Sequence, residues 1–358
     1  MLSGNIFLPM AFLFHWSVLA DIPVARGLAG PVAGVSGGVM LLGGGNNFPQ
    51  DMPWEGGVKV YYDQVYLLEA GGERWSIAGK LEEPVAYAAC VSTSRGLVYI
   101  GGENVQGVSK KVYLLIWDGV ARRLRSERLA DLPVGLSNAA AVEIGGRIYV
   151  AGGEMPEGVS NAFYCLEESG WVELASMPRA LSHMVLAADE EGGVIYLAGG
   201  RKRNPGGLSD LSDALYAYVI PSGKWERRAS LPYAISAGTG ICIGKGRLLL
   251  MGGDRGEVFH KAEALIAEIA KERDEERRSR LAAEKAVVQS SHPGFSRRLL
   301  SYDARADRWK ESGRMQGPAQ VTTTAFRWQG KIVIPGGEVR AGVRTVRVSV
   351  VEIKKTKT

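Results

Sequence analysis

A glutamate and an arginine stand close together near the C-terminal end of the chain, in the segment IPGGEVRAGVRT that covers residues 334–345. Glu338 directly follows two glycines, and Arg344 follows a short stretch that contains a further glycine. A carboxylate in a pocket can act as a general base, and a guanidinium can fork two hydrogen bonds onto a substrate carboxylate. The alternative is a surface ion pair that ties one loop together.

Other polar residues recur at two kinds of position, either just after a Gly-Gly doublet or at a turn marked by proline. Loops of both kinds emerge on one face of a ring of sheets, around its central channel. Polar side chains that converge there favour a small-ligand site, although a lone histidine at such a turn is more often structural. The candidates for substrate binding are Arg26, Asn47, Glu103, Asn138, His183 and Arg201.

Several familiar catalytic and metal-binding patterns are absent from the sequence. No histidine pair has metal-ligand spacing, and neither a Gly-x-Ser-x-Gly elbow nor a Walker-type phosphate loop occurs. Cys90, Cys165 and Cys242 each lie inside an apolar run and form no pair at metal-ligand spacing, which predicts small core residues. We therefore expect no metal and no cofactor.

The elements that must position these side chains form an internal repeat. Six Gly-Gly doublets each end a short aliphatic run, and a second apolar run follows most of them. Glycine tolerates positive φ and close backbone approach where one strand turns into the next. The doublets are Gly43-Gly44, Gly101-Gly102, Gly152-Gly153, Gly199-Gly200, Gly252-Gly253 and Gly336-Gly337.

Each repeat continues with aromatic residues and a proline turn. The pairs Tyr164 and Trp171, Tyr218 and Trp225, and Tyr302 and Trp309 share one spacing, and turns such as DLPVG and SMPRA follow. Large flat side chains fill the space between neighbouring sheets. The order strand, strand, Gly-Gly, strand, strand, turn is that of a four-stranded kelch blade. The sequence therefore predicts an all-β fold, a six-bladed kelch-type β-propeller in one domain over residues 1–358.

The N-terminal segment predicts how this ring closes. Trp16 lies before the first doublet, while the last blade ends after its third strand, near residues 346–353. The N-terminal strand should therefore complete the C-terminal blade and leave no strand edge open. Residues 6–14 also look like a signal-peptide core with a cleavage point after Ala20, but no Lys or Arg precedes them, and cleavage there would remove the closing strand.

The interval between the fifth and sixth doublets is the longest and contains an insertion. Residues 254–297 include an apolar stripe at helical spacing and then a highly charged stretch, which predict helices inside the fifth blade. Such helices could cap the pocket mouth or contact a second subunit in a homodimer, and both arrangements stay open.

Charge and hydropathy limit the partners. The net charge is +5, but the densest basic cluster, residues 273–285, alternates with acidic residues as a solvated helix face does, so we expect no nucleic-acid partner. No apolar run approaches the length needed to cross a membrane.

The motif around Glu338 resembles the Gly-Glu-x-Lys-Pro-Gly-x-Arg-Thr signature of the bacterial N-acetylneuraminate epimerases, the sialic acid mutarotases, which are six-bladed kelch propellers. GGNNFP at residues 44–49, HPGF at 292–295 and VTTTA at 321–325 extend the resemblance. Arg340 stands where Lys is usual and Ala341 where Pro is usual. The blade order looks like that of a cyclically permuted branch of the family.

The resemblance implies an isomerase that interconverts the α- and β-anomers of N-acetylneuraminate by acid/base ring opening. It implies Glu338 as proton acceptor and a sugar acid as the small-molecule substrate. It also implies Arg344 as a partner in the active site, where we expect its guanidinium to meet the substrate carboxylate. It also implies a periplasmic location, with a cytoplasmic one as the alternative because the signal peptide is atypical.

Two other functions compete with this interpretation. A non-catalytic kelch ring that binds a glycan or a protein would expose aromatic and apolar loop tips instead of a polar channel. A sialidase would need Asp-box turns of the Ser-x-Asp-x-Gly-x-x-Trp type, and the sequence contains none.

Overall fold

The fold of the chain is a ring of six antiparallel four-stranded sheets, seen in a computed structural model that describes residues 12–355. The all-β propeller with six blades is confirmed. Most of the N-terminal apolar run, residues 6–11, lies outside the described part. Among the described residues, no helix combines the length and apolar character needed to cross a bilayer.

The blades are numbered in chain order. The strands of each blade are given from the innermost to the outermost. Blade 1 contains β2 (Ala29–Ser36), β3 (Val39–Asn47), β5 (Gln64–Leu68) and β6 (Ser76–Lys80), with β4 (Val60–Tyr61) added to β3. Blade 2 contains β7 (Ala89–Ser92), β8 (Leu97–Ile100), β11 (Val112–Asp118) and β12 (Arg123–Arg128). Blade 3 contains β13 (Ala140–Ile144), β14 (Arg147–Ala151), β17 (Phe163–Glu167) and β18 (Gly170–Glu173).

The second half of the ring follows the same plan. Blade 4 contains β19 (Val185–Asp189), β20 (Val194–Ala198), β23 (Leu215–Val219) and β24 (Lys224–Arg228). Blade 5 contains β25 (Thr239–Cys242), β26 (Arg247–Met251), β27 (Arg298–Asp303) and β28 (Arg308–Arg314). Blade 6 contains β29 (Phe326–Trp328), β30 (Lys331–Pro335), β33 (Val348–Lys355) and β1 (Phe12–Val18).

Short hairpins and helices extend from the loops that follow the Gly-Gly doublets. The hairpins are β9 (Glu103–Asn104) with β10 (Gly107–Val108), β15 (Glu154–Met155) with β16 (Gly158–Val159), β21 (Arg201–Lys202) with β22 (Asp210–Leu211), and β31 (Glu338–Arg340) with β32 (Val343–Arg344). The 3-10 helix η1 (Pro53–Glu55) and the α-helices α1 (Glu257–Lys271) and α2 (Glu275–Ser290) also lie in these loops. A second 3-10 helix, η2 (Ile220–Ser222), lies instead in the turn between β23 and β24.

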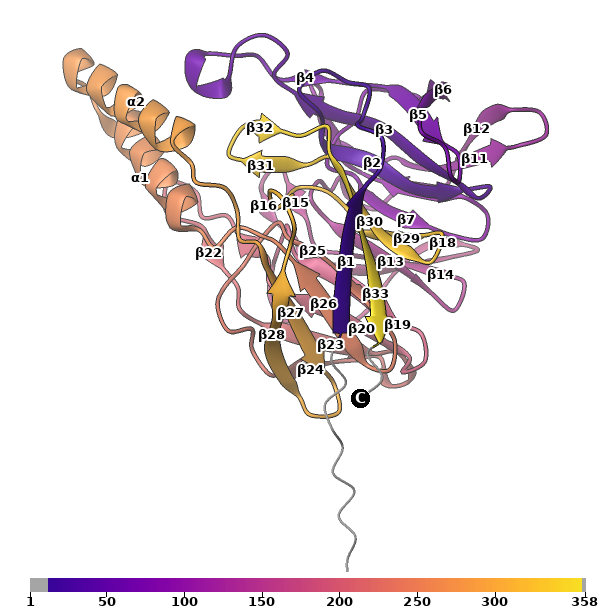
Figure 1. Cartoon of the computed structure of the whole chain (residues 1–358). Coiled ribbons are helices and arrows are strands. Elements are labelled where there is room, and N and C mark those ends of the chain that lie inside the picture. The colour runs from indigo at the N-terminus through magenta and orange to yellow at the C-terminus, as the bar shows by residue number, and fades with distance from the viewer. Residues whose placement is uncertain (1–11, 356–358) are drawn as a thin grey trace, which may run out of the picture.

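Blade 6 is closed by the N-terminal strand, as predicted. Strand β1 pairs antiparallel with β33, so that Trp16 lies opposite Val351, and Figure 1 shows the two strands side by side. Phe14 and Trp16 pack against a core cluster that includes Ile332, Ile334 and Val351. The first and last described strands thus share one sheet and leave β33 covered on both edges.

Four tryptophans of the repeat each join their own blade to the one before it. The indole Nε1 of Trp171 donates a hydrogen bond to the carbonyl of Ala130 at 2.8 Å, and Trp225 and Trp309 donate in the same way to Ala175 and Ala229. Trp75 donates to Ala20. Each acceptor alanine comes three residues before a proline turn. The repeated Trp and Pro therefore mark contacts between blades as well as within them.

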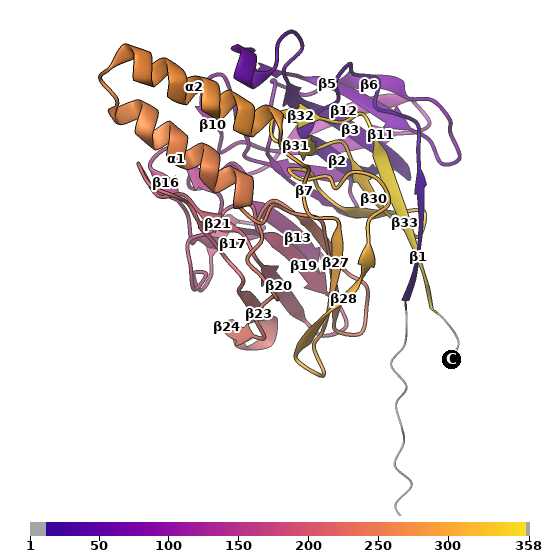
Figure 2. The same ribbon diagram turned by 60° about the vertical axis from the view of Figure 1, so that its left-hand side comes forward.

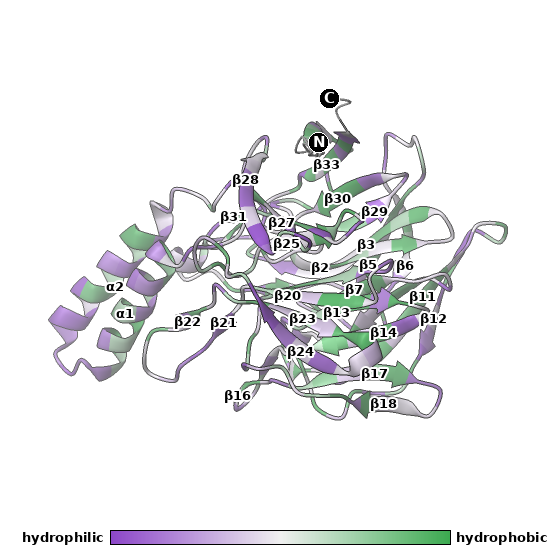
Figure 3. Cartoon of the chain, turned by 90° about the horizontal axis from the view of Figure 1, so that it is seen from below, coloured by the Kyte–Doolittle hydropathy of each residue, from purple (hydrophilic) through white to green (hydrophobic). Residues whose placement is uncertain are grey.

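The inner strands are largely apolar, whereas the outer strands contain more charged residues, as in β13 (AAVEI) and β24 (KWERR). In Figure 3, β7 and β13 are largely green, whereas the outer strand β24 is purple. The three cysteines are buried and unpaired, which agrees with their expected place in the core. This arrangement leaves the loops at one end of the ring free to carry polar groups.

Helices α1 and α2 interrupt blade 5 between β26 and β27. They form an antiparallel pair beside the β31–β32 hairpin (Figures 1 and 2). Helix α1 is pinned to the loop of blade 4, because Glu263 accepts hydrogen bonds from the backbone N–H and hydroxyl of Ser209, and His260 Nε2 contacts the carbonyl of Ser209 at 2.9 Å. Residues of α1 and Gln289 of α2 line the pocket, so the helices lie over its mouth, which is one of the two arrangements open from the sequence.

Candidate active site

Six residues, one from each blade, form a closed ring of backbone hydrogen bonds around the propeller axis. Each N–H donates to the carbonyl of the preceding blade's residue at 2.8 to 3.1 Å. All six have left-handed backbone conformations, with φ between 51° and 57°, which costs energy for residues other than glycine. The closed ring of backbone hydrogen bonds holds the six residues in this conformation. They are Gly30, Tyr87, Asn138, His183, Ala237 and Thr322.

A second set of six residues lies beside this axial ring, directly after the Gly-Gly doublets. Each pairs with the residue that precedes an axial-ring member, as Glu338 pairs with Val321 and Arg201 with Ser182. Gly337, with φ of 90°, permits this approach, because a Cβ there would lie 2.4 Å from the carbonyl oxygen of Val321. The set is Asn46, Glu103, Glu154, Arg201, Asp254 and Glu338.

Blade 1 departs from the register expected from the sequence. Its paired left-handed glycines are Gly44 and Gly45, not Gly43 and Gly44, because three glycines follow one another there. Asn46 therefore takes the position equivalent to Glu338. Asn47 is buried and donates hydrogen bonds to the carbonyls of Ala25 and Gly27.

Arg26 does not lie at the propeller axis, although the sequence predicted it beside the central channel. The chain of blade 1 contains extra residues between its proline turn and the axial ring, so Gly30 takes the axial position. Arg26 is exposed and donates to the carbonyl of Phe48 at 3.2 Å. Neither Arg26 nor Asn47 lines the cavity described next.

A cavity of about 350 Å³ lies between the two sets of six residues and helix α1. Four of the six residues predicted for substrate binding, Glu103, Asn138, His183 and Arg201, line it together with Glu338. Helix α1 adds an apolar wall. The cavity is also lined by Lys59, Tyr87, Glu154, Asp254, Phe259, Glu263, Ile266 and His292.

Glu338 and Arg344 form an ion pair at one side of this cavity. They are paired on the β31–β32 hairpin, and Arg344 Nη2 lies 3.3 Å from Glu338 Oε1. The other carboxylate oxygen accepts a hydrogen bond from the N–H of Gly342 at 3.1 Å. The hairpin therefore holds the carboxylate of Glu338 in a fixed orientation at the cavity wall.

The guanidinium of Arg344 lies behind that wall. Its side chain is 4% exposed, Nη2 also donates to Asn46 Oδ1 at 3.0 Å, and its plane lies over the ring of Phe48 at 4.6 Å. Nε and Nη1 are buried without a hydrogen-bond partner. Buried donors of a charged group without partners are unusual, and Arg344 does not line the cavity.

Across the cavity, a second polar cluster surrounds His183. Arg201 Nη2 lies 3.2 Å from His183 Nε2, and His183 Nδ1 lies 3.0 Å from the hydroxyl of Ser182. Burial, and then the charge of Arg201, hold the pKa of His183 well below 6.5. His183 is therefore a neutral imidazole at neutral pH, with Nε2 accepting from Arg201.

Two further cavity groups have shifted pKa values. Burial, and then the charge of Glu338, raise the pKa of Tyr87 to about 12, so its hydroxyl is protonated at neutral pH. Burial lowers the pKa of His292, whose Nδ1 accepts a hydrogen bond from the N–H of Gly294. The HPGF motif signalled His292 in the sequence, whereas nothing there singled out Lys59 or Phe259.

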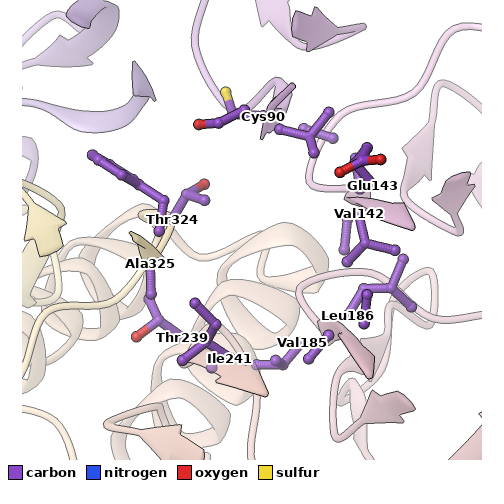
Figure 4. A pocket seen from close by; sticks show the side chains of 18 of the residues that line it. Cys90, Val142, Glu143, Val185, Leu186, Thr239, Ile241, Thr324 and Ala325 are labelled. Carbon is purple, nitrogen blue, oxygen red and sulfur yellow. The ribbon is translucent and has the colours of Figure 1, made fainter. Parts of the chain in front are cut away.

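The channel continues on the other side of the axial ring into a second cavity of about 470 Å³. Figure 4 shows its wall, where apolar side chains such as Val142, Leu186 and Ile241 surround the opening. Its polar groups are spread among them, as with Glu143 and Thr324. Of these two cavities along the axis, the one under α1 has the clustered charges. Within residues 12–355, no three His, Cys, Asp or Glu side chains are placed to hold a metal ion.

Comparison with known proteins gives one family. Residues 129–358 match the family model described as NANM, N-acetylneuraminate epimerase. The N-acetylneuraminate epimerase of Brucella melitensis is 26% identical over 238 residues, which cover 64% of this chain and 60% of that protein. That of Haemophilus influenzae strain PittEE is 26% identical over 221 residues, 60% of this chain and 56% of that protein.

These alignments span less than two thirds of the length of the curated relatives. The solved structure of YjhT superposes on 94% of this chain and 100% of its own with a TM-score of 0.64 and 15% sequence identity. At that identity, the likeness concerns the fold alone.

Proposed function

Because this chain belongs to the N-acetylneuraminate epimerase family, we propose that it interconverts the α- and β-anomers of N-acetylneuraminate by opening and reclosing the sugar ring. One observation carries the proposal. Glu338 presents an oriented carboxylate to a small polar cavity under α1, which also contains a protonated hydroxyl and an arginine. A base, a proton donor and a cation are the groups that mutarotation of a sugar acid requires.

Each proton that is transferred when the sugar ring opens is transferred back when the ring closes. Glu338 takes the proton of the anomeric hydroxyl while the bond between the anomeric carbon and the ring oxygen breaks. The electron pair of that bond goes to the ring oxygen, which takes a proton from a donor on the protein, and an open-chain ketone results. After rotation, the same hydroxyl adds to the other face of the ketone, the donor recovers its proton, and Glu338 returns its own to the new anomeric oxygen.

Tyr87 is the donor that we assign to the ring oxygen. It lies on the axial ring and lines the cavity with Glu338. Burial and the charge of Glu338 keep its hydroxyl protonated, since they raise its pKa to about 12. An alkoxide leaving group is more basic than this phenolate, so the proton transfer is feasible.

The test is direct observation of anomer exchange. N-acetylneuraminate in neutral buffer would be followed by NMR exchange spectroscopy with and without the protein. We expect cross-peaks between the two anomers to grow faster with catalytic amounts of protein. An exchange rate equal to that in buffer would reject the proposal.

The competing function, a ring that binds a glycan or protein without catalysis, gives a different outcome. In that case, N-acetylneuraminate or a partner would bind while the exchange rate stayed at the buffer value. The carboxylates under α1 favour chemistry over docking, because a protein-binding face is depleted in such charges. Release of free sugar acid from a sialyl-lactose conjugate would instead indicate a sialidase.

Three properties of the chain remain predictions. They are the periplasmic location, with a cytoplasmic one as the alternative, the homodimer, and the cyclically permuted blade order. Osmotic-shock fractionation and light scattering of the purified protein test the first two.

A further inference from the structure

We propose that Arg201, rather than Arg344, holds the carboxylate of the sugar acid, and that Arg344 is a positioning residue for Glu338. This inference rests on the proposed function, because it names the part of the cavity that recognises the substrate's charge. It reverses the expectation that Arg344 meets the substrate.

Arg344 cannot reach a ligand in the cavity as the structure stands. Its side chain is 4% exposed, and Nε and Nη1 have almost no accessible surface. One face of the guanidinium is covered by Phe48, and Nη2 is engaged by Glu338 and Asn46. A substrate carboxylate on Arg344 would also displace or crowd the carboxylate of Glu338, which is the base that the reaction needs.

Arg201 is open to the cavity in the way that Arg344 is not. It lines the cavity, and its side chain is 19% exposed. Among the residues that the structure describes, its guanidinium makes one hydrogen bond, from Nη2 to His183 Nε2. Glu154 Oε1 lies 3.5 Å away. Donors on the rest of the guanidinium edge are therefore free for a forked pair of bonds to a carboxylate.

The surroundings of Arg201 fix its plane. Phe259 of α1 covers one face of the guanidinium, with the ring centroid 4.7 Å from Cζ. Stacking of this kind leaves the edge donors in place for coplanar recognition. Because His183 is neutral, it accepts from Arg201 and adds no second positive charge. The positive charge at this wall is thus that of Arg201, and Phe259 and His183 fix the orientation of its guanidinium.

Charge elsewhere in the cavity directs an anion to the same wall. Glu103, Asp254, Glu263 and Glu338 line other parts of the cavity and would repel a carboxylate, whereas the wall of Arg201 contains one carboxylate, Glu154, 3.5 Å from Nη2. A sugar acid bound with its carboxylate on Arg201 still has its reacting carbon inside the cavity that contains Glu338. Because the substrate carboxylate is bonded to the anomeric carbon, the proposal requires Arg201 and Glu338 to act on neighbouring atoms, and both side chains line this one cavity.

Lys59 is the other cation at the cavity, and it serves as the matched control. Its ammonium lies 3.6 Å from Glu103 Oε1 and packs over the rings of Tyr61 and Tyr87 at 5.6 and 5.5 Å. An ammonium is a point charge without the fork that fits a carboxylate. We therefore assign substrate recognition to Arg201 alone.

The experiment compares two substrates, N-acetylneuraminate and its carboxamide, in which the acid is replaced by a neutral amide of similar shape. Anomer exchange of each, at concentrations below saturation, would be measured by NMR for the wild type, Arg201→Met, Lys59→Met and Arg344→Met. The wild type should prefer the acid by about 100-fold, since loss of a charged partner typically has an effect of this order. Arg201→Met should lower that preference to near unity.

The controls make the outcome decisive. Arg344→Met should slow both substrates by the same factor, and Lys59→Met should keep the wild-type preference. Arg201→Lys should restore part of it. The inference would be overturned if Arg201→Met kept the wild-type preference for the acid over the carboxamide. It would also be overturned if Lys59→Met or Arg344→Met lost that preference. If the wild type does not accelerate exchange at all, the proposed function fails, and calorimetric titration of both compounds into the same variants then decides the role of Arg201.

Discussion

Glu338 and Arg344 face each other across the two-stranded β31–β32 hairpin, with Arg344 Nη2 3.3 Å from Glu338 Oε1. The arginine also reaches Asn46 in blade 1, so the pair joins the last blade to the first at the cavity wall. The carboxylate faces the cavity and the guanidinium faces the core. Several predictions about catalysis and stability depend on this division.

Replacing Glu338 by Gln removes the base but keeps the size and the hydrogen bond from Gly342. We expect anomer exchange of N-acetylneuraminate to slow by about 10²- to 10⁴-fold, the usual range for a general base. Glu83→Gln is the matched control, since Glu83 also forms an ion pair, with Lys111, but does not line the cavity. It should retain most of the activity. Equal losses in both variants would contradict the assignment.

Replacing Arg344 by Met should lower both stability and turnover. Removing one partner of a buried ion pair leaves a charge without compensation and costs about 3 to 5 kcal/mol. The free energy of unfolding, measured with denaturant, should fall by an amount near the lower end. The double variant with Glu338→Gln should be more stable than the sum of the two single changes predicts. Simple additivity would mean that the pair is not coupled.

Tyr87→Phe should reduce the turnover number by about 100-fold with little change in KM, because the variant keeps the ring but lacks the proton for the ring oxygen. The axial ring uses the backbone of Tyr87, so the fold should persist, as near-ultraviolet circular dichroism can verify. Wild-type turnover in this variant would assign the proton donor elsewhere.

The buried histidine makes stability depend on pH. Because the pKa of His183 is held well below 6.5 in the folded chain, the unfolded chain binds more protons than the folded one in the window below 6.5. Stability from this group is therefore full above about pH 6.5 and is lost as the pH falls, by at most about 1.4 kcal/mol per pH unit.

His183→Gln should flatten that slope, leaving the part that His292 contributes in the same direction. Urea unfolding at several pH values between 5 and 7.5 measures it. His15→Gln, at an exposed position on β1, is the control and should leave the slope unchanged. An unaltered slope in His183→Gln would show that protonation of this histidine is not linked to unfolding.

Removal of the first 20 residues should destabilise blade 6. Strand β33 would lose its partner β1 and expose an unpaired edge, and Trp75 would lose its acceptor at Ala20. Exposed edges pair with other chains, so a lower melting temperature and oligomers in size-exclusion chromatography are expected. A chain that starts at residue 12 keeps β1 and should behave like the full chain. A monomeric, equally stable truncated protein would contradict the importance of closure.

Much of the fold follows from sequence because the repeat has a physical cause at each position. The doublets permit close backbone contacts, and the tryptophans donate to the preceding blade. The closure of blade 6 by the strand that contains Trp16 followed from counting the strands of the repeat. The register of blade 1 did not follow, because three consecutive glycines allow two alignments and only the pairing of Ala29 with Asn46 selects one.

The candidate site was predictable only in part. Residues after the doublets could be placed near the axis from the repeat alone. Which of two arginines is accessible depends on the packing of Phe48 and Asn46 around Arg344 and of Phe259 on Arg201. Phe48 and Asn46 come from blade 1, and Phe259 from the inserted helix. No local pattern in the sequence connects these segments.

The axial ring has a consequence for how such a site can change. Its six members, Gly30, Tyr87, Asn138, His183, Ala237 and Thr322, differ in size and chemistry, yet the bonds between them involve only backbone atoms. At Gly30 a Cβ would lie 2.6 Å from the backbone N of Tyr87, so only glycine fits there. At the other five positions the frame accepts different side chains. Exchange of one for another alters the floor of the cavity without altering the frame, so new substrate preferences can evolve, or be engineered, one position at a time.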